Sequence, residues 1–175
     1  KEHGQKAPNS NRTLTGTGPE TWTHDHTKTG VHDLCGNIWE VLAGLRIKNG
    51  VLMVAANNDA ALPETDLTQC GDDWKLLTDD KGAPVYVSAS GSEIVFTTDN
   101  DEAGGVGSSE WGKVKTECKS EMLKEYALFA GEEEAYCYID ATEGEYIPIR
   151  GGYWSNGEGA GVFALNLGNP RSSSW

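Results

Sequence analysis

The sequence predicts a loop-rich α+β fold with short antiparallel strands and one or two helices. Glycine accounts for 22 of the 175 residues, a share that favours turns and loops over long helices. Strong turn signals separate short apolar segments, and Lys48-Asn49-Gly50 is the clearest of them. Residues 117–130 instead carry apolar side chains at helical spacing. A chain of this length supports one domain with a sizeable core.

The N-terminal region is polar. Residues 1–20 show no hydrophobic periodicity, so we expect an arm there, followed by one folded domain over residues 21–175. The next stretch, Trp22-Thr23-His24-Asp25-His26, holds side chains that can bind a metal ion. We interpret it instead as structural hydrogen bonding around a packed tryptophan, because few further ligands lie close in the sequence.

A turn and a strand are expected next. Gly36-Asn37 supplies a tight turn, since both residues tolerate a positive φ. Ile38 and Trp39 are then expected to enter the core, in a strand that runs to about Leu45.

Two hairpins follow. Lys48-Asn49-Gly50 joins strands expected at residues 45–47 and 51–54. Residues 84–88 and 93–98 predict a second hairpin, turning around positions 89–91. The polar segment between the hairpins is expected to be a loop.

Residues 99–102 cluster three carboxylates, which a calcium ion could use. The segment lacks the full spacing of a calcium-binding loop, so we interpret it as an exposed acidic loop. Residues 117–130 predict a helix with Gly131 at its C-terminal cap. Its apolar stripe consists of Met122, Leu123, Tyr126 and Phe129. Short strands are expected at 135–139 and 146–149.

Composition limits the partners. Acidic residues exceed basic ones by 27 − 14 = 13, which disfavours nucleic acid and anionic membranes. No apolar run is long enough to span a membrane. Four separated cysteines (Cys35, Cys70, Cys118 and Cys137) show no zinc or redox spacing, and they could form bridges or remain thiols.

The last 27 residues, 149–175, alternate apolar positions with small or amphipathic ones. Tyrosine and tryptophan supply contact area, and serine, asparagine and glycine supply adjustable hydrogen bonds, so this mixture is typical of a binding surface. The same residues also fit an ordinary buried strand at 161–167 between polar loops.

Two motifs resemble one family. Residues 150–154 spell R-G-G-x-W, and A-G-V-F-A-L-N-L-x-N-P-R-S-x-S follows at residues 160–174. Residues 29–40, T-G-V-H-D-L-C-G-N-I-W-E, form the second motif, in which Val41 replaces the usual second tryptophan. Together they resemble the variable proteins of diversity-generating retroelements, which have a C-type lectin fold of the formylglycine-generating-enzyme type. The resemblance covers about 40 residues and implies that fold over residues 21–175.

In this family, error-prone copying at adenines diversifies selected positions of a ligand-binding region, here residues 149–175. The resemblance implies that the variable, ligand-contacting positions are Tyr153, Ser155, Asn156, Glu158, Gly159, Gly168, Ser172, Ser174 and Trp175. It implies that the supporting scaffold includes Gly36, Asn37, Trp39, Arg150, Gly151, Gly152, Trp154, Asn166, Asn169 and Arg171. Tyr153 and Trp175 are the expected anchors, because aromatic rings dominate interface energetics.

The function expected from this resemblance is ligand display, without catalysis, metal or cofactor. The ligand would be a protein or glycan on a host or target cell surface, and the protein would lie on a virion tail or a cell surface. The oligomeric state stays open. One alternative is an oxygen-dependent oxidase of the formylglycine-generating type, although no cysteine follows Cys137 to form a late copper-binding pair. Another is a metal-dependent sugar-binding lectin, although the E-P-N and W-N-D strings are missing.

Overall fold

The computed structural model describes residues 4–129 and 134–173. It corrects the predicted fold class. The chain is mostly β, with a closed barrel of seven strands and a single short α-helix in its described part, and 13% of residues are helical. The α+β assignment, and the C-type lectin fold expected with it, are therefore wrong.

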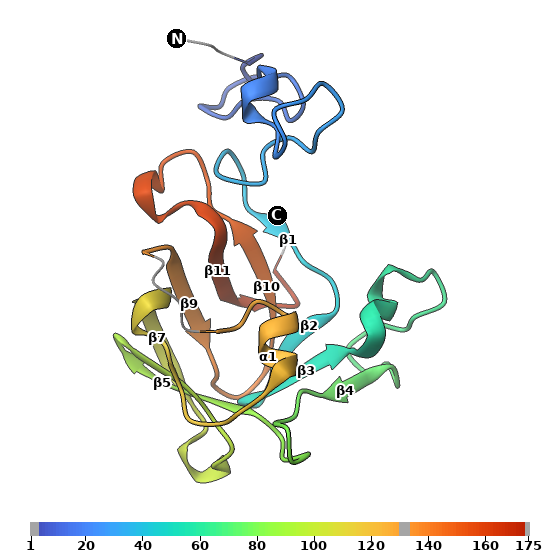
Figure 1. Ribbon diagram of the computed structural model, residues 1–175, viewed down its shortest axis with the longest axis vertical. Helices are drawn as coiled ribbons and strands as arrows, with labels where there is room; N and C mark the ends of the chain where they lie inside the picture. Colours follow the sequence, from blue (N-terminus) through green and yellow to red (C-terminus); the bar gives the residue numbers. More distant parts are fainter. Residues whose placement is uncertain (1–3, 130–133, 174–175) are drawn as a thin grey trace.

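The barrel closes because the strand order returns to its start (Figure 1). Its order is β2 (Leu45–Lys48), β3 (Val51–Ala55), β5 (Tyr86–Gly91), β7 (Gly104–Glu110), β9 (Tyr136–Asp140), β11 (Gly161–Pro170) and β10 (Glu145–Gly151), which pairs with β2. Four short strands lie outside the ring: β1 (Glu40–Val41) on β10, β4 (Trp74–Leu76) on β3, β6 (Glu93–Thr97) on β5 and β8 (Lys115–Thr116) on β6.

Closure depends on one short junction. Val51 of β3 pairs with Tyr86 of β5, and the amide of Val87 donates to the carbonyl of Gly50 at 2.9 Å. A closed ring leaves its members without free edges, which removes the tendency of edge strands to pair with other chains.

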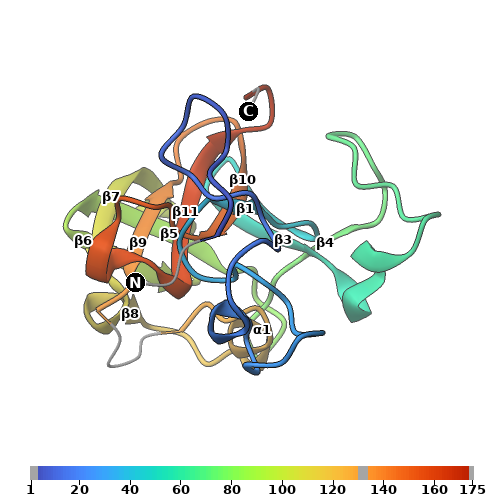
Figure 2. The same cartoon turned by 90° about the horizontal axis from the view of Figure 1, so that it is seen from above.

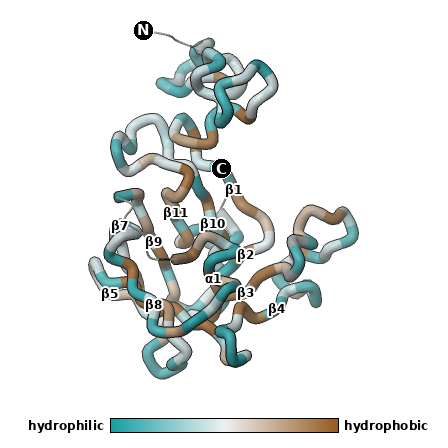
Figure 3. Tube along the Cα trace, viewed as in Figure 1, coloured by the Kyte–Doolittle hydropathy of each residue, from teal (hydrophilic) through white to brown (hydrophobic). Residues whose placement is uncertain are grey.

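The core follows the two-residue period of the strands. On β9 the buried Cys137 and Ile139 alternate with the partly buried Tyr136 and Tyr138. Most of the buried apolar side chains of the ring strands form one continuous cluster with Trp111. Figure 3 shows hydrophobic stretches along barrel strands such as β3.

Both hairpins are confirmed. The β2–β3 pairing joins Lys48 to Val51, and Asn49 and Gly50 both have positive φ values, 50° and 79°, as a type I′ turn requires. In the β5–β6 hairpin, strand β5 extends to Gly91, so the turn falls later than predicted.

The strand expected from Ile38 to about Leu45 is interrupted. Only Glu40–Val41 and then Leu45–Lys48 are extended strands. Trp39 is partly buried, with its ring centroid 6.4 Å from that of Tyr136.

The expected helix at 117–130 is reduced to α1 (Glu121–Glu125). Ser120 starts it, because its side chain accepts from the amide of Leu123 at 3.2 Å. Ala127 ends it by adopting a φ of 52°, while the amide of Leu128 bonds to the carbonyl of Leu123. The proposed cap at Gly131 lies outside the described residues.

The other helical turns in the described part are 3₁₀: η1 (Glu20–Trp22), η2 (Ala56–Ala61), η3 (Asn100–Glu102), η4 (Trp111–Lys113) and η5 (Gly157–Gly159).

Residues 4–37 form an N-terminal lobe at one end of the molecule (Figure 1), which lies in front of the barrel when seen from above (Figure 2). The lobe is largely hydrophilic (Figure 3). The first 20 residues were expected to be an arm, but the amide of Gly16 donates to Asp33 at 3.3 Å. The described part of that arm is therefore tied to the rest of the lobe.

A buried ion cluster joins three strands. Glu145, at the start of β10, accepts from Arg46 of β2 at 2.7 Å and from Arg171, just after β11, at 2.7 and 3.0 Å. The side chains of Arg46 and Glu145 are 3% and 2% exposed. The Arg46 guanidinium also lies 4.2 Å from the centre of the Trp74 ring.

The arginines control the ionisation of Glu145. Burial is the largest single influence and raises the pKa of its carboxyl, but the hydrogen bonds and charges of Arg171 and Arg46 together outweigh burial. The pKa of Glu145 is therefore lowered on folding. A lowered folded-state pKa stabilises the protein above the ordinary carboxyl pKa, and this contribution is lost as pH falls through the folded value.

We predict that Glu145→Gln lowers the free energy of unfolding by about 3 kcal/mol at pH 7, because the buried charge of Arg46 loses its opposite charge. The difference from wild type should shrink as pH falls, since wild-type Glu145 then becomes neutral too. Urea unfolding at a series of pH values measures both effects. Glu121→Gln is the matched control, because its ion pair with Lys124 is exposed and should contribute nothing measurable. An equal effect of the two substitutions would contradict the prediction.

Candidate ligand-binding site

The two sequence motifs meet in space. The amide of Gly36, in the first motif, donates to the carbonyl of Gly151 in the second at 2.8 Å. The amide of Trp154 donates to the carbonyl of Asn37 at 3.2 Å. Strand β1, at the end of the first motif, pairs with β10 through Glu40 and Arg150. The first motif therefore supports the backbone from which the second motif's loop projects.

Asn37 also fixes the N-terminal lobe. Its side chain accepts from the amide of Thr13 at 2.9 Å and donates to the carbonyl of Thr13 at 2.9 Å. Its φ of 61° is in the left-handed region, which asparagine tolerates better than most residues. One asparagine thus ties the lobe, through Thr13, to the loop at Trp154.

Arg150 ties the second motif to the barrel. Its guanidinium donates to the carbonyls of Phe163, Tyr126 and Ala127 at 3.3, 3.2 and 3.1 Å. These carbonyls belong to β11 and to the turn that ends α1. Burial lowers the pKa of Arg150, which Cys137 partly offsets. Hydrogen bonds to three carbonyls make a lysine a poor substitute, because only the planar guanidinium has this fork of donors.

Gly151 and Gly152 turn the chain out of β10. Their φ values are 94° and 82°, a region that favours glycine. A β-carbon at Gly152 would lie 2.9 Å from both the α- and β-carbons of Ala160, so no side chain fits there. Both residues are buried, and they set the direction in which the following loop leaves the barrel.

The loop of residues 153–159 carries five of the predicted variable positions. Ser155 and Glu158 are exposed, whereas Tyr153 and Gly159 are partly buried. Asn156 is occupied structurally, because its side-chain oxygen accepts from the amide of Tyr153 at 2.6 Å. A free recognition role is therefore best supported at the exposed positions of this loop.

Trp154 differs from its expected place in the scaffold. Its side chain is 50% exposed, and its ring meets that of Tyr153 edge-on, with centroids 6.4 Å apart. Only its backbone contributes to the frame, through the bond to Asn37. The alternation of apolar and polar residues in this part of the sequence indicates that the Trp154 ring is buried. Strand β10 ends at Gly151, however, so the two-residue period of a strand no longer applies at Trp154.

Gly168, one of the predicted ligand-contacting positions, is partly buried and packs closely against the neighbouring strand. A β-carbon there would lie 2.2 Å from Cε1 of Tyr138 on the neighbouring strand β9. The amide of Gly168 also donates to the side chain of Asn166, which accepts from Asn169 as well. Asn166 and Asn169 therefore brace this end of β11.

The remaining predicted positions lie elsewhere. Ser172 is exposed just after β11, next to Arg171, which binds Glu145. In the β10–β11 hairpin, Tyr146 pairs with Pro170 and Gly151 pairs with Gly161, so Ser172 is at the opposite end from the 153–159 loop. Seven strand residues separate two such ends by about 20 Å. Ser174 and Trp175 are outside the described residues.

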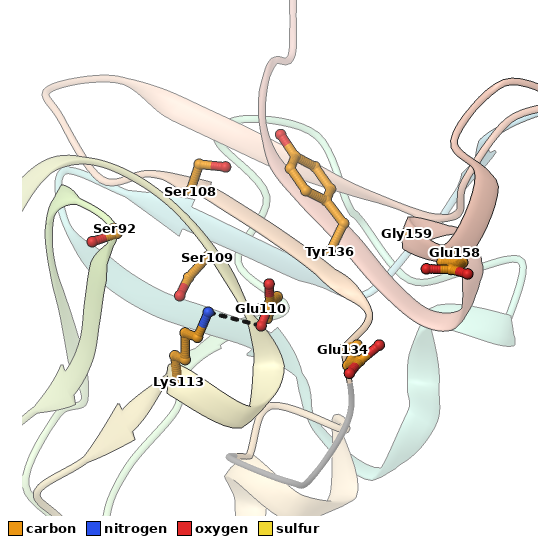
Figure 4. A pocket seen from close by; sticks show the side chains of 9 residues that line it. All are labelled: Ser92, Ser108, Ser109, Glu110, Lys113, Glu134, Tyr136, Glu158 and Gly159. Carbon is orange, nitrogen blue, oxygen red and sulfur yellow. Dashed lines mark ion pairs between the residues drawn. The ribbon is translucent and has the colours of Figure 1, made fainter.

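A hollow beside the loop involves residues that the sequence did not indicate. It has a volume of about 470 Å³ and lies between η5, which carries Glu158 and Gly159, and strands β7 and β9 (Figure 4). Tyr136 forms one wall, with its ring stacked on that of Tyr138 at 6.5 Å. Glu110 faces Lys113 at 2.9 Å in an exposed ion pair (Figure 4). The sequence of β7, G-G-V-G-S-S-E, carries no apolar alternation that could have indicated this wall.

Other candidate chemistry is weak in the described part of the chain. No group of three or more His, Cys, Asp or Glu side chains there is placed to hold a metal ion. Burial raises the pKa of the Cys137 thiol to about 12, although Arg150 lowers it slightly.

Asp25 accepts from Thr27, and His24 accepts from the amide of Val31, so both serve structural hydrogen bonds as the sequence predicts. Trp22, however, is 39% exposed and not packed inside.

Comparison with known proteins assigns no family. No protein-family model matches the chain, and no curated protein matches it. Within the described residues, no helix has the length and apolar character needed to cross a membrane.

We predict that Gly168→Ala lowers the free energy of unfolding by about 1–3 kcal/mol, because the added methyl group displaces the Tyr138 ring. Gly161→Ala in the same strand is the matched control, since its β-carbon would meet nothing within 4 Å. Guanidinium unfolding of both variants compares the two positions. If Gly168→Ala is as stable as Gly161→Ala, Gly168 has no packing role.

Proposed function

We propose that the chain is a ligand-binding module that presents the 153–159 loop to its target. One observation carries this proposal: the loop's backbone is held by groups other than its exposed side chains. The amide of Trp154 is bound by the carbonyl of Asn37, and the amide of Tyr153 is bound by Asn156. Ser155 and Glu158 extend from this support and can change without altering it.

That arrangement suits a variable protein of a diversity-generating retroelement, the class that the two motifs resemble. Diversification requires positions that tolerate many side chains, next to positions that tolerate few. Ser155 and Glu158 are of the first kind, whereas Gly152 and Gly168 have no room for a β-carbon. In this proposal the closed barrel serves as the scaffold in place of a lectin fold.

The proposed target is a protein or glycan on a host or target cell surface, with the module carried on a virion or a cell surface. The net charge of −13 supports this choice over nucleic acid, because a phosphate backbone repels an acidic protein.

A binding role is also proposed in preference to oxidation. An oxidase of the formylglycine-generating type would need reactive thiolates. Burial is the main cause that raises the pKa of both Cys118 and Cys137, which favours their protonated thiols.

We predict that most replacements at Ser155 and Glu158 change the free energy of unfolding by no more than about 0.5 kcal/mol. Gly152→Ala should cost about 1–3 kcal/mol, because it adds both a strained φ and a clash with Ala160. Saturation mutagenesis with selection for protease resistance of the displayed protein ranks all substitutions in one experiment. Equal intolerance at all three positions would show that the loop's side chains determine its fold.

A separate measurement tests the retroelement itself. Sequencing of the neighbouring DNA should show a reverse-transcriptase gene and a near-repeat of the segment that encodes residues 149–175. The two copies should differ at positions that are adenine in the repeat. A neighbourhood with neither feature would contradict this origin, while the mutagenesis result would still decide whether the loop is replaceable.

A further inference from the structure

A second hollow lies between the N-terminal lobe and the barrel, and the 153–159 loop contributes Trp154 to its lining. Its volume is about 530 Å³, within the range of small-ligand sites. The lobe contributes Trp22 and Leu34 to its walls, and the barrel side contributes Trp154 and Val162. We name this hollow the aromatic cleft.

Two tryptophans face solvent at this cleft. Trp22 is 39% exposed and Trp154 is 50% exposed. Large aromatic side chains that remain exposed around one hollow mark interaction sites more often than ordinary surface.

Each ring is supported from one side. Trp22 packs on Gly18, where a β-carbon would lie 2.3 Å from Cε3 of the ring. Trp154 is supported edge-on by Tyr153. Both rings can therefore offer their remaining surface to a ligand without losing their positions.

The two walls are also fixed relative to each other. Asn37 joins Thr13 of the lobe to Trp154 of the loop through three hydrogen bonds of 2.9, 2.9 and 3.2 Å. A ligand would thus meet a cleft that is already formed, which limits the ordering cost of binding.

The polar lining decides the ligand class. The residues that line the cleft in the described chain include no lysine or arginine, which disfavours phosphorylated and sulfated ligands. Asp33, the one carboxylate among them, is 7% exposed and already accepts from the amide of Gly16. A cationic ligand would therefore find little free negative charge.

Other polar side chains also line the cleft. Asn11 lies exposed in the lining, and His24 lines the cleft with its Nδ1 already bound to the amide of Val31. A wholly apolar ligand would desolvate such groups without replacing their hydrogen bonds. A pyranose ring suits both features, since its C–H face packs on a flat aromatic ring while its hydroxyl groups meet amides and imidazoles.

We propose that the aromatic cleft binds a neutral saccharide, with Trp22 and Trp154 as its stacking surfaces. This inference rests on the proposed binding function and narrows its ligand to the glycan class. It also gives the N-terminal lobe a direct part in recognition.

An array of neutral, sulfated and sialylated oligosaccharides is the first test. At least one neutral oligosaccharide should bind, and the strongest neutral binder is then titrated by tryptophan fluorescence. Trp22→Ala and Trp154→Ala should each weaken that binding by about tenfold or more. Trp22→Phe and Trp154→Phe should retain most of it, because a ring remains.

Leu62→Ala removes an exposed apolar side chain that does not line the cleft, and it should leave affinity unchanged. Cys35 gives a second measurement, since it is exposed within the cleft lining, while the exposed Cys70 is outside it. The bound saccharide should slow alkylation of Cys35 and not of Cys70.

The inference is overturned if no neutral oligosaccharide binds at millimolar concentration, if only charged glycans bind, or if binding survives both alanine substitutions. Protection of Cys70 alone would also place the ligand elsewhere. If alanine variants fail to fold, the phenylalanine variants and the alkylation rates still decide. The tolerance of Ser155 and Glu158 is independent of these results, so failure of the saccharide proposal does not imply failure of the role proposed for the 153–159 loop.

Discussion

The buried carboxylate of Glu145, held between Arg46 and Arg171, is the interaction on which the C-terminal hairpin depends. It joins β2, the first residue of β10 and the end of β11 at a single point. Ion pairs in the interior stabilise only when their geometry is good and every partner is present. Here the contact with Arg171 is bidentate, and the Arg46 guanidinium lies over Trp74. Arg150 holds the other end of the same hairpin, so both ends of the β10–β11 pair are secured by arginine.

Local signals in the sequence were sufficient to predict several elements of secondary structure. A two-residue hairpin turn needs two successive residues with positive φ, and Asn49 and Gly50 are residue types that adopt such values. The apolar stretch from Gly161 matches β11. Ser120 and Ala127 shortened the helix through caps that the apolar stripe does not encode. Phe129, the last member of that stripe, follows the turn at Ala127 and is 41% exposed.

Contacts between distant residues could not be predicted. Barrel closure depends on Val51 meeting Tyr86, and no local pattern indicates that pairing. Strand β7 lacks alternating apolar residues, and Gly107 sits where a β-carbon would meet Ile94 at 2.8 Å. For the same reason the surroundings of individual site residues could not be predicted. Gly168 is compatible with an open surface until Tyr138 of the neighbouring strand is placed against it.

The 153–159 loop contributes residues to two hollows of different character, one lined by Tyr136 and carboxylates and the other by two tryptophans. Its support comes from the carbonyl of Asn37 and from the partly buried side chain of Asn156, and not from the exposed side chains of Ser155 and Glu158. Amide hydrogen exchange of Gly36, Tyr153 and Trp154 tests this support most directly, because each of these amides donates to a named partner in the frame. All three should exchange at least about tenfold more slowly than in an unfolded chain, and equally so after Ser155 and Glu158 are both replaced by lysine. Exchange at unfolded-chain rates, or loss of protection on that replacement, would contradict a frame that is independent of its exposed side chains.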